Sequence, residues 1–343
     1  MNKIPVVFAS DNNYVMPTIV AITSMLINKK LDTHYDIYIL DNNICADSKN
    51  KFFLNDYKEN YDIHFLPLNL KELEEWKGNG NWPITTFGRF FVCDLLLEHD
   101  KCIYMDGDTL ILDDLTELFN TDISNKFFAG VKSPGTNYNV AANKHDFLSK
   151  DRDKYFLKCI NAGVLLMNLK LLRDNGGGEF LKKKTFEISN NLEKGKIVTD
   201  QDIINMLFAD KIQYVDLKYN FYINNIINHF ERHYYPFCFT RDVIEDAFLH
   251  PVIIHYALPE KPWKYSNAKA VYPFLYKKTV SLWQEYYNKS PLGNKKLKKK
   301  RLSFFIVMYY RLKPFLKQNR FLLKMKRNLS NTKVDSQIHD FFD

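Results

Sequence analysis

Short apolar runs alternate with helix-compatible segments along the first half of the chain, and this alternation restricts the fold more than any other feature. The runs have the β-branched and aromatic character of strands and lie at residues 6–10, 34–41, 61–68 and 101–105. Segments 14–28 and 84–97, which lie between them, place apolar residues at helical spacing. The sequence therefore predicts the α/β class, with a mostly parallel sheet covered by helices on both faces.

Acidic residues stand where several of these predicted strands end. Asp11 follows the first strand, Asp41 closes the second, and Asp106-Gly107-Asp108 follows the strand at 101–105. Ligands of α/β proteins bind beyond the carboxyl ends of such strands. The two carboxylates of the pair point the same way from an extended backbone, and Mn²⁺ and Mg²⁺ prefer such oxygens. We expect Gly107 to let a ligand approach the main chain, although an isolated pair of aspartates is also common in surface turns.

Two later segments supply partners for the acidic pair. A buried strand is predicted at 159–169, a helix from Gly178 onward, and a further helix at 199–208 with Thr199 as its N-cap. An apolar strand then ends at His255, and Lys261 follows in a rigid Lys-Pro-Trp turn. An imidazole can serve as a third metal ligand, so one crevice at the strand ends could hold these groups together.

The net charge of +8 is distributed unevenly along the chain. Residues 291–343 contain 14 Lys and Arg but 3 Asp and Glu, whereas the preceding residues contain 34 and 37. Apolar residues recur at helical spacing in this segment, and Pro314 is expected to bend or divide the helix; they are Leu302, Phe305, Tyr309, Leu312 and Leu316. A basic amphipathic helix suits an anionic membrane surface. A solvated tail or a nucleic-acid patch is the alternative, but the aliphatic content and the absence of a nucleic-acid module disfavour RNA or DNA.

Cysteine usage and hydropathy bear on the compartment. The five cysteines are scattered and odd in number, which we interpret as buried free thiols in a reducing compartment. The apolar run near the N-terminus is too short for a signal peptide, and no run approaches the ~20 residues of a membrane span. The sequence thus predicts a cytoplasmic protein, peripheral on the inner face of the cytoplasmic membrane.

Six motifs in colinear order, within residues 4–265, give the chain a likeness to a known family. They are VVFASDNNYV, TTFGRFFVCDLL, IYMDGDTL, NAGVLLMNL, TDQDIIN and HYALPEKPW. Together they resemble glycosyltransferase family 8, particularly its bacterial lipopolysaccharide glucosyl- and galactosyltransferases. The resemblance implies a GT-A-type nucleotide-sugar-binding domain with a mainly parallel mixed sheet. It also implies retaining transfer of a hexose from a UDP-sugar to a saccharide acceptor, in lipopolysaccharide or other surface-glycan synthesis.

The resemblance further implies roles for individual residues. Uracil and ribose would be held by Ala9, Asp11, Asn13 and Tyr14, and the remainder of the donor by Arg89, Gly107, Ala162, Gly163 and Lys261, with Lys261 on the diphosphate. The ligands of Mn²⁺, or of Mg²⁺ in its place, would be Asp106, Asp108 and His255, with Asp106 also near the ribose. The transferred sugar would be surrounded by the catalytic residues Asn161, Asp200 and Gln201, with Gln201 beneath the anomeric carbon.

Some questions stay open at the level of sequence. An amide is a poor nucleophile, which favours front-face attack over a covalent intermediate on Asp200 or Gln201. Lys132 and Ser133 depart from acidic residues common in the family, so glucose and galactose both remain candidates. A lipid-linked acceptor is expected, with walls from residues 133–155 and 220–246. The predicted domains are a catalytic domain at 1–265, a helical extension at 266–290 and a membrane-associating tail at 291–343.

Two other classes of function compete with this interpretation. The stretch MDGDTLILDD is similar to the nucleophile motif of haloacid-dehalogenase-type phosphatases, but it lies about a hundred residues into the chain and has Leu110 where those enzymes carry Thr or Val. A non-catalytic, nucleotide-sugar-binding membrane protein is the second alternative. Presence of all three metal-ligand candidates together with Lys261 disfavours it.

Overall fold

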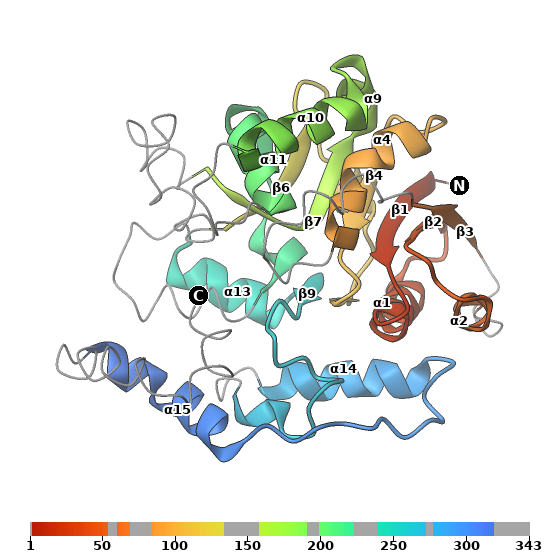
Figure 1. Cartoon of the computed structure of the whole chain (residues 1–343). Helices are drawn as coiled ribbons and strands as arrows, with labels where there is room; N and C mark the ends of the chain where they lie inside the picture. Colours follow the sequence, from red (N-terminus) through yellow and green to blue (C-terminus); the bar gives the residue numbers. More distant parts are fainter. Residues whose placement is uncertain are drawn as a thin grey trace.

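A seven-stranded mixed sheet forms the centre of the molecule in a computed structural model of the chain (Figure 1). The structure describes residues 2–53, 60–68, 84–133, 158–190, 199–222, 239–271 and 277–318. In spatial order the strands are β3 (Tyr61–Pro67), β2 (Thr33–Asp41), β1 (Asn2–Ser10), β4 (Lys101–Met105), β7 (Ile160–Asn168), β6 (Phe128–Lys132) and β8 (Ile212–Tyr214). Neighbours are parallel except that β7 runs antiparallel to both β4 and β6, which confirms the predicted α/β class with a mainly parallel mixed sheet.

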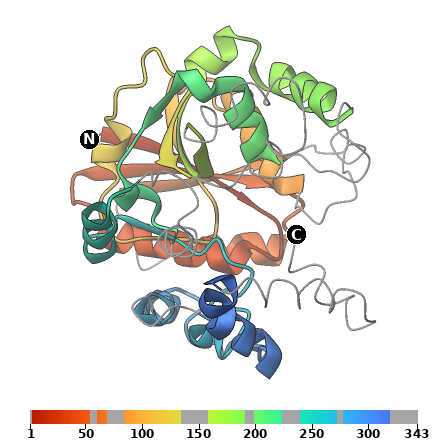
Figure 2. The ribbon, with the colours of Figure 1, turned by 90° about the vertical axis from the view of Figure 1, so that its left-hand side faces the viewer.

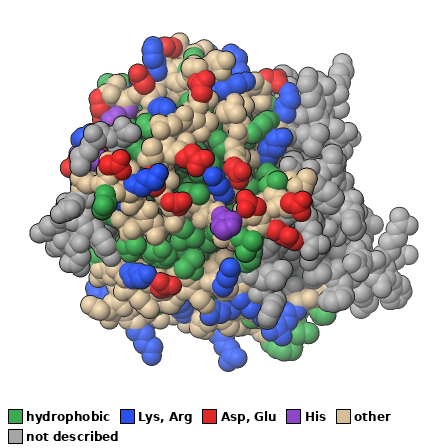
Figure 3. All heavy atoms as spheres, turned by 180° about the vertical axis from the view of Figure 1, so that it is seen from behind, with side chains coloured by type: hydrophobic (Ala, Val, Ile, Leu, Met, Phe, Trp, Pro, Cys, Tyr) green, Lys and Arg blue, Asp and Glu red, His purple; other side chains and the backbone are tan. Residues whose placement is uncertain are grey.

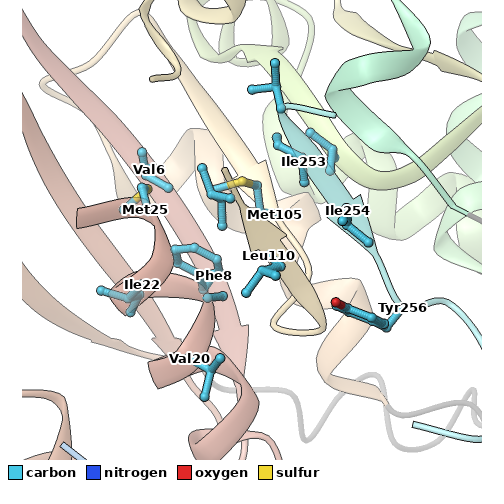
Figure 4. Packing of buried hydrophobic residues seen from close by; sticks show 14 of the residues in the cluster. Val6, Phe8, Val20, Ile22, Met25, Met105, Leu110, Ile253, Ile254 and Tyr256 are labelled. Carbon is cyan, nitrogen blue, oxygen red and sulfur yellow. The ribbon is translucent and has the colours of Figure 1, made fainter. Parts of the chain in front are cut away.

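Helices cover both faces of the sheet because side chains alternate along its strands. Val6 and Phe8 of β1 pack with α1 (Val15–Asn28), as Figure 4 shows, while Val7 between them belongs to the core on the opposite face. That opposite core also takes residues from α4 (Val92–Leu95), α9 (Leu169–Asp174), α10 (Gly177–Asn190) and α11 (Asp200–Phe208). Figure 2 shows α1 between the sheet and the C-terminal elements.

Short elements complete the chain. The segment expected to be helical at 84–97 is a 3-10 helix, η3 (Ile84–Phe91), that leads into α4. The remaining short elements are α2 (Ala46–Lys49), η1 (Asn50–Phe52), α5 (Thr116–Phe119), η4 (Ala209–Lys211), η5 (Leu217–Asn220), α13 (Arg241–Leu249) and η6 (Ala268–Ala270). Asp114 accepts a hydrogen bond from the backbone N–H of Thr116 and so supports the start of α5.

A second, two-stranded sheet places a strand from late in the chain beside the acidic pair. In it β5 (Thr109–Ile111) and β9 (Ile253–His255) run antiparallel, with Thr109 opposite His255. The N–H of Tyr256 donates to the carbonyl of Asp108 at 2.9 Å. This pairing places residues about 150 positions apart side by side.

The C-terminal elements pack beneath α1. Helix α14 (Lys277–Lys289) joins α1 through a hydrogen bond of 2.8 Å between Asn28 and the Tyr286 hydroxyl. The segment that follows runs back along the body, and its residues Leu292 and Leu302 are buried in the core that also contains α1. Helix α15 (Phe304–Gln318) then continues through Pro314, so the proline does not divide it. Within the described residues, no helix combines the length and hydrophobicity needed to cross a bilayer.

The predicted apolar stripe of the tail is divided between the body and the surface. Leu302 precedes α15 and is buried, whereas Phe305 is 81% and Leu312 42% exposed. Ile306 and Val307 pack against the core instead. The prediction of buried thiols holds for Cys93, Cys102 and Cys159 but is wrong for Cys45, which is exposed at the start of α2, because this end of the sheet carries a short surface turn; Cys238 lies outside the described residues.

Candidate active site

A pocket of about 340 Å³ lies where β1 and β4 end and β7 begins. Because β7 is antiparallel to β4, its first residues reach the same sheet edge as the last residues of β4. The residues predicted from sequence that line it are Ala9, Asp11, Tyr14, Arg89, Asp106, Gly107, Asp108, Asn161, Ala162, Gly163, Asp200, Gln201, His255 and Lys261. Asn13 does not line it; this residue is exposed, and its backbone N–H donates to the Asp11 carboxylate at 2.9 Å.

Asp108 is buried and has two close basic neighbours. One of its oxygens lies 3.3 Å from His255 Nε2, and the other accepts a hydrogen bond of 2.5 Å from Lys261 Nζ. Burial alone would raise the pKa of Asp108, but the cationic Lys261 and the His255 ring reverse this and hold it well below its usual value. The same His255 nitrogen lies 3.9 Å from Asp106. The three predicted metal ligands therefore converge, with Lys261 beside them.

The glycine between the two aspartates serves packing in this structure. A Cβ on Gly107 would lie 2.3 Å from Thr18 Oγ1 and 3.5 Å from the Tyr14 ring, both next to or within α1. A side chain here would therefore collide with the protein itself, and the main chain of Gly107 lines the pocket. Gly163 is similar, since a Cβ there would lie 2.2 Å from Cε1 of His255, so this glycine admits the imidazole.

Arg89 connects the two halves of the pocket. Only 2% of its side chain is exposed; its Nη2 donates to Asp106 at 2.9 Å, and its Nε lies 2.8 Å from an oxygen of Asp200. Its Nη1 donates to the Ala162 carbonyl, and its guanidinium lies 4.4 Å from the centre of the Tyr104 ring. Burial lowers its pKa, but Asp200 and Asp106 outweigh burial and raise it. Protein acceptors take all three nitrogens, so Arg89 fixes these carboxylates in place.

The first turn of α11 presents Asp200 and Gln201 to the pocket. Thr199 caps the helix, accepting from the N–H of Asp202 while Asp202 accepts from the N–H of Thr199. This capping box confirms the predicted N-cap. Burial raises the pKa of Asp200, an effect that Arg89 opposes, and burial raises the pKa of Asp202 to about 6.

Two amide side chains that line the pocket, those of Gln201 and Asn161, have defined orientations. The backbone N–H of Ala162 donates at 2.9 Å to Oε1 of Gln201, so the carbonyl of this side chain faces the protein. The N–H of Gly163 donates at 2.9 Å to Oδ1 of Asn161. A backbone N–H can only donate, so the side-chain atom that accepts from it is the oxygen of each amide.

The donor set of the acidic cluster fits a divalent cation. Asp106, Asp108 and His255 each offer an atom within 4.8 Å of the others. Two carboxylates and one imidazole suit Mn²⁺ better than Ca²⁺, which prefers oxygens alone. A second cluster with the same residue types, His34, Asp36 and Asp62, lies at the opposite ends of β2 and β3. There the exposed amine of Lys3 stands 3.5 Å from Asp36 and 3.7 Å from Asp62.

The structure adds pocket residues that sequence reasoning missed. They are Thr85, Thr86, Tyr104, Thr199, Asp202 and Ala257. Thr85 and Thr86 stand in a quoted motif, so proximity to Arg89 could have identified them. Asn220, expected in an acceptor wall, is instead fully buried behind His255, with its Oδ1 3.0 Å from Nδ1. Most of the expected acceptor walls, namely residues 134–155 and 223–238, lies outside the described residues.

Two curated relatives of the chain are named as glycosyltransferases. The glycosyltransferase GlyE of Streptococcus pneumoniae is 28% identical over 272 residues, an alignment that covers 76% of this chain and 57% of GlyE. The chain thus spans little more than half the length of that relative. The lipopolysaccharide 1,3-galactosyltransferase of Salmonella typhimurium is 24% identical over 317 residues, covering 87% of this chain and 84% of that protein.

A solved structure and a family profile complete the comparison. The crystal structure of the galactosyltransferase LgtC, a complex with donor and acceptor sugar analogues, superposes with a TM-score of 0.64 at 24% identity. The superposition covers 84% of this chain and 96% of LgtC, and it shows that the two share a GT-A-type fold. The profile of glycosyl transferase family 8 matches residues 5–267, which contain every lining residue of the pocket. The chain belongs to glycosyl transferase family 8.

Proposed function

We propose that the chain is a retaining hexosyltransferase that moves glucose or galactose from a UDP-sugar to a saccharide acceptor. The observation that carries this proposal is the placement, in one buried pocket, of a carboxylate–imidazole cluster next to Lys261 and of Asp200 and Gln201 across Arg89. Family membership supports the reaction class, and the galactosyltransferases among the relatives support a hexose donor.

Different groups of pocket residues have different roles in this proposal. Asp11 and Tyr14 line the β1 side of the pocket, and the proposal assigns them to uracil and ribose. Asp106, Asp108 and His255 would hold Mn²⁺ or Mg²⁺, which supplies positive charge beside the diphosphate leaving group. Lys261 Nζ, already 2.5 Å from Asp108, adds a fixed charge for the same phosphate oxygens.

The orientation of Gln201 favours front-face attack. Its oxygen is the only atom of the side chain that could attack the anomeric carbon, and that oxygen accepts the N–H of Ala162. The amide N–H₂ remains to donate to a sugar hydroxyl. Asp200 is held by Arg89 through a contact of 2.8 Å, which keeps it in place for hydroxyl binding. Both features support a route in which the departing phosphate oxygen deprotonates the acceptor.

Hydrolysis of radiolabelled UDP-glucose and UDP-galactose tests the proposal. We expect hydrolysis that requires Mn²⁺ or Mg²⁺ and falls by about 10²- to 10³-fold in Asp108→Asn. Asp113→Asn is the matched control, because Asp113 is exposed in the same stretch and does not line the pocket. Binding of UDP without turnover would support the non-catalytic alternative. Hydrolysis of p-nitrophenyl phosphate that is insensitive to UDP would support the phosphatase.

We also propose that the C-terminal segment associates with an anionic membrane, at the inner face of the cytoplasmic membrane, where a lipid-linked acceptor for surface glycan is presented. Phe304 is 72% and Phe305 81% exposed at the start of α15, beside a run of six basic residues at 295–301. Figure 3, seen from behind, shows Lys and Arg side chains along the lower edge of the molecule and hydrophobic ones at its lower right, in the region of α15. Each basic residue near such a surface can add ~1 kcal/mol.

Flotation with vesicles tests the membrane proposal. We expect the full chain to bind vesicles that contain phosphatidylglycerol, and not vesicles of phosphatidylcholine alone, with weaker binding at high salt. Phe304→Ser with Phe305→Ser should reduce the bound fraction at unchanged melting temperature. The matched control is Leu31→Ser, because Leu31 is 92% exposed but lies outside the C-terminal segment. Equal binding by both variants would contradict the proposal.

A further inference from the structure

A chain of buried hydrogen bonds leads from a backbone amide of β7 to the ring of His255. The N–H of Gly163 donates to Oδ1 of Asn161 at 2.9 Å. Nδ2 of Asn220 donates to the same oxygen at 2.8 Å, and Oδ1 of Asn220 lies 3.0 Å from His255 Nδ1. Asn161, Asn220 and His255 are 7%, 0% and 5% exposed, so solvent has little access to any of these groups.

The direction of every bond in this chain follows from its first member. Because the Gly163 N–H can only donate, the atom of Asn161 that it meets is the carbonyl oxygen. That oxygen must accept from Asn220, which orients the Asn220 N–H₂ toward Asn161. The carbonyl of Asn220 is then the group that faces His255. Nδ1 of the ring is therefore the donor, and Nε2 is the nitrogen directed at Asp106 and Asp108.

The backbone holds Asn220 in register with His255. Phe221, directly after η5, donates to the carbonyl of Ile253 at 2.8 Å, and its own carbonyl accepts from the N–H of His255 at 3.1 Å. The N–H of Val252 donates to the Lys218 carbonyl at 2.9 Å. Three bonds thus join the η5 segment to β9. Because Gly163 of β7 has no side chain, the imidazole of His255 can pack against its main chain.

We propose that Asn220 is a positioning residue of the metal site: it fixes Nδ1 of His255 as the hydrogen-bearing nitrogen and so presents Nε2 to the cation. The inference rests on the metal site of the proposed function. It gives Asn220 a role different from the one expected from sequence, which was to form part of the acceptor wall. Partners of this kind set the ring orientation and tautomer of metal-bound histidines, and their loss commonly costs 10- to 100-fold in metal affinity.

The tautomer can be observed directly in the metal-free, full-length protein. With ¹⁵N-labelled histidine, long-range ¹H–¹⁵N correlation spectra distinguish a ring nitrogen that bears a hydrogen from one that does not, and His255→Gln identifies the signals. We expect Nδ1 of His255 to bear the hydrogen in the wild type. Detection of an Nδ1 without hydrogen would overturn the proposal, whatever the behaviour of any variant.

Variants then test the consequence for the metal. Asn220→Leu removes the acceptor and should weaken Mn²⁺ binding, titrated with and without UDP, by about 10- to 100-fold. Asn220→Asp retains an acceptor for Nδ1 and should retain the Nδ1–H tautomer. The matched control is Asn205→Leu, because Asn205 is also buried, at 2% exposed, and its side chain bonds the backbone of Ile160 and Gln201 and not the ring of His255.

The outcomes separate this inference from the proposed function. Weaker Mn²⁺ binding in Asn220→Leu, with binding preserved in Asn205→Leu, would support it. Equal binding by the wild type and Asn220→Leu would overturn the inference and leave the metal site intact. Absence of Mn²⁺ binding by the wild type would overturn the metal site of the proposed function and, with it, the role of Asn220 there.

Discussion

Charged side chains are concentrated both in the pocket and in the segment at 291–301. They are paired with opposite charges in the pocket but, in the part of the chain that the structure describes, not in the segment. In the pocket, buried groups have partners of opposite sign within a few ångströms, as in the contacts of Arg89 with Asp106 and Asp200. In the C-terminal segment, six basic side chains have no carboxylate partner among the described residues, and Lys299 accordingly has a pKa lowered by burial and by the like charge of Lys269. Charge in the pocket is paired within the fold, whereas charge in the segment is not paired with a carboxylate of the described residues.

Replacement of one arginine in each region should produce the largest difference in unfolding free energy between the two regions. Arg89→Met leaves the buried Asp200 and the partly buried Asp106 without their common partner, and loss of one member of a buried pair costs about 3–5 kcal/mol. Arg301→Met removes an exposed charge and should change the free energy of unfolding by less than about 0.5 kcal/mol. Urea denaturation of both variants measures the difference. Equal losses would show that burial does not distinguish the two regions.

Gly107 offers a smaller and more specific test of how the pocket edge is built. Gly107→Ala places a Cβ 2.3 Å from Thr18 Oγ1, and such overpacking costs about 1–3 kcal/mol. In the double variant with Thr18→Ala, part of that stability should return, because the clashing oxygen is absent. If stability recovers but UDP-sugar hydrolysis does not, glycine is also needed for ligand approach, as the sequence suggested.

The sequence predicted the parts of the site that depend on local pattern. Strand ends at Asp106 and at His255 were visible because apolar runs stop there, and the N-cap at Thr199 was visible from helix chemistry. The partners of Arg89 and the role of Asn220 could not be predicted, since both depend on pairing between distant segments. The antiparallel direction of β7 could not be predicted either, because a strand whose residues are all buried has the same apolar pattern in either direction.

The pH dependence of stability should also distinguish the two regions, with the smallest expected effect. Burial raises the pKa of Asp202 from its ordinary value of 3.8 to about 6. The folded protein thus retains a proton that the unfolded chain releases between these values. The resulting stability is fully present below pH 3.8 and is lost as pH rises through 6, which amounts to about 1.4 kcal/mol between pH 5 and pH 8.

Denaturation of the wild type and Asp202→Asn at pH 5 and pH 8 isolates this contribution. Asparagine cannot ionise but can still accept from the N–H of Thr199, so the capping box is largely preserved. The difference in unfolding free energy between wild type and variant should therefore change by about 1.4 kcal/mol across this range. A variant at Lys298, which is exposed in the C-terminal segment, should show no such change. If the difference in unfolding free energy between wild type and Asp202→Asn is the same at both pH values, Asp202 is as well solvated as the side chains of the C-terminal segment. The contrast between the two regions would then apply to Arg89 and its partners but not to Asp202.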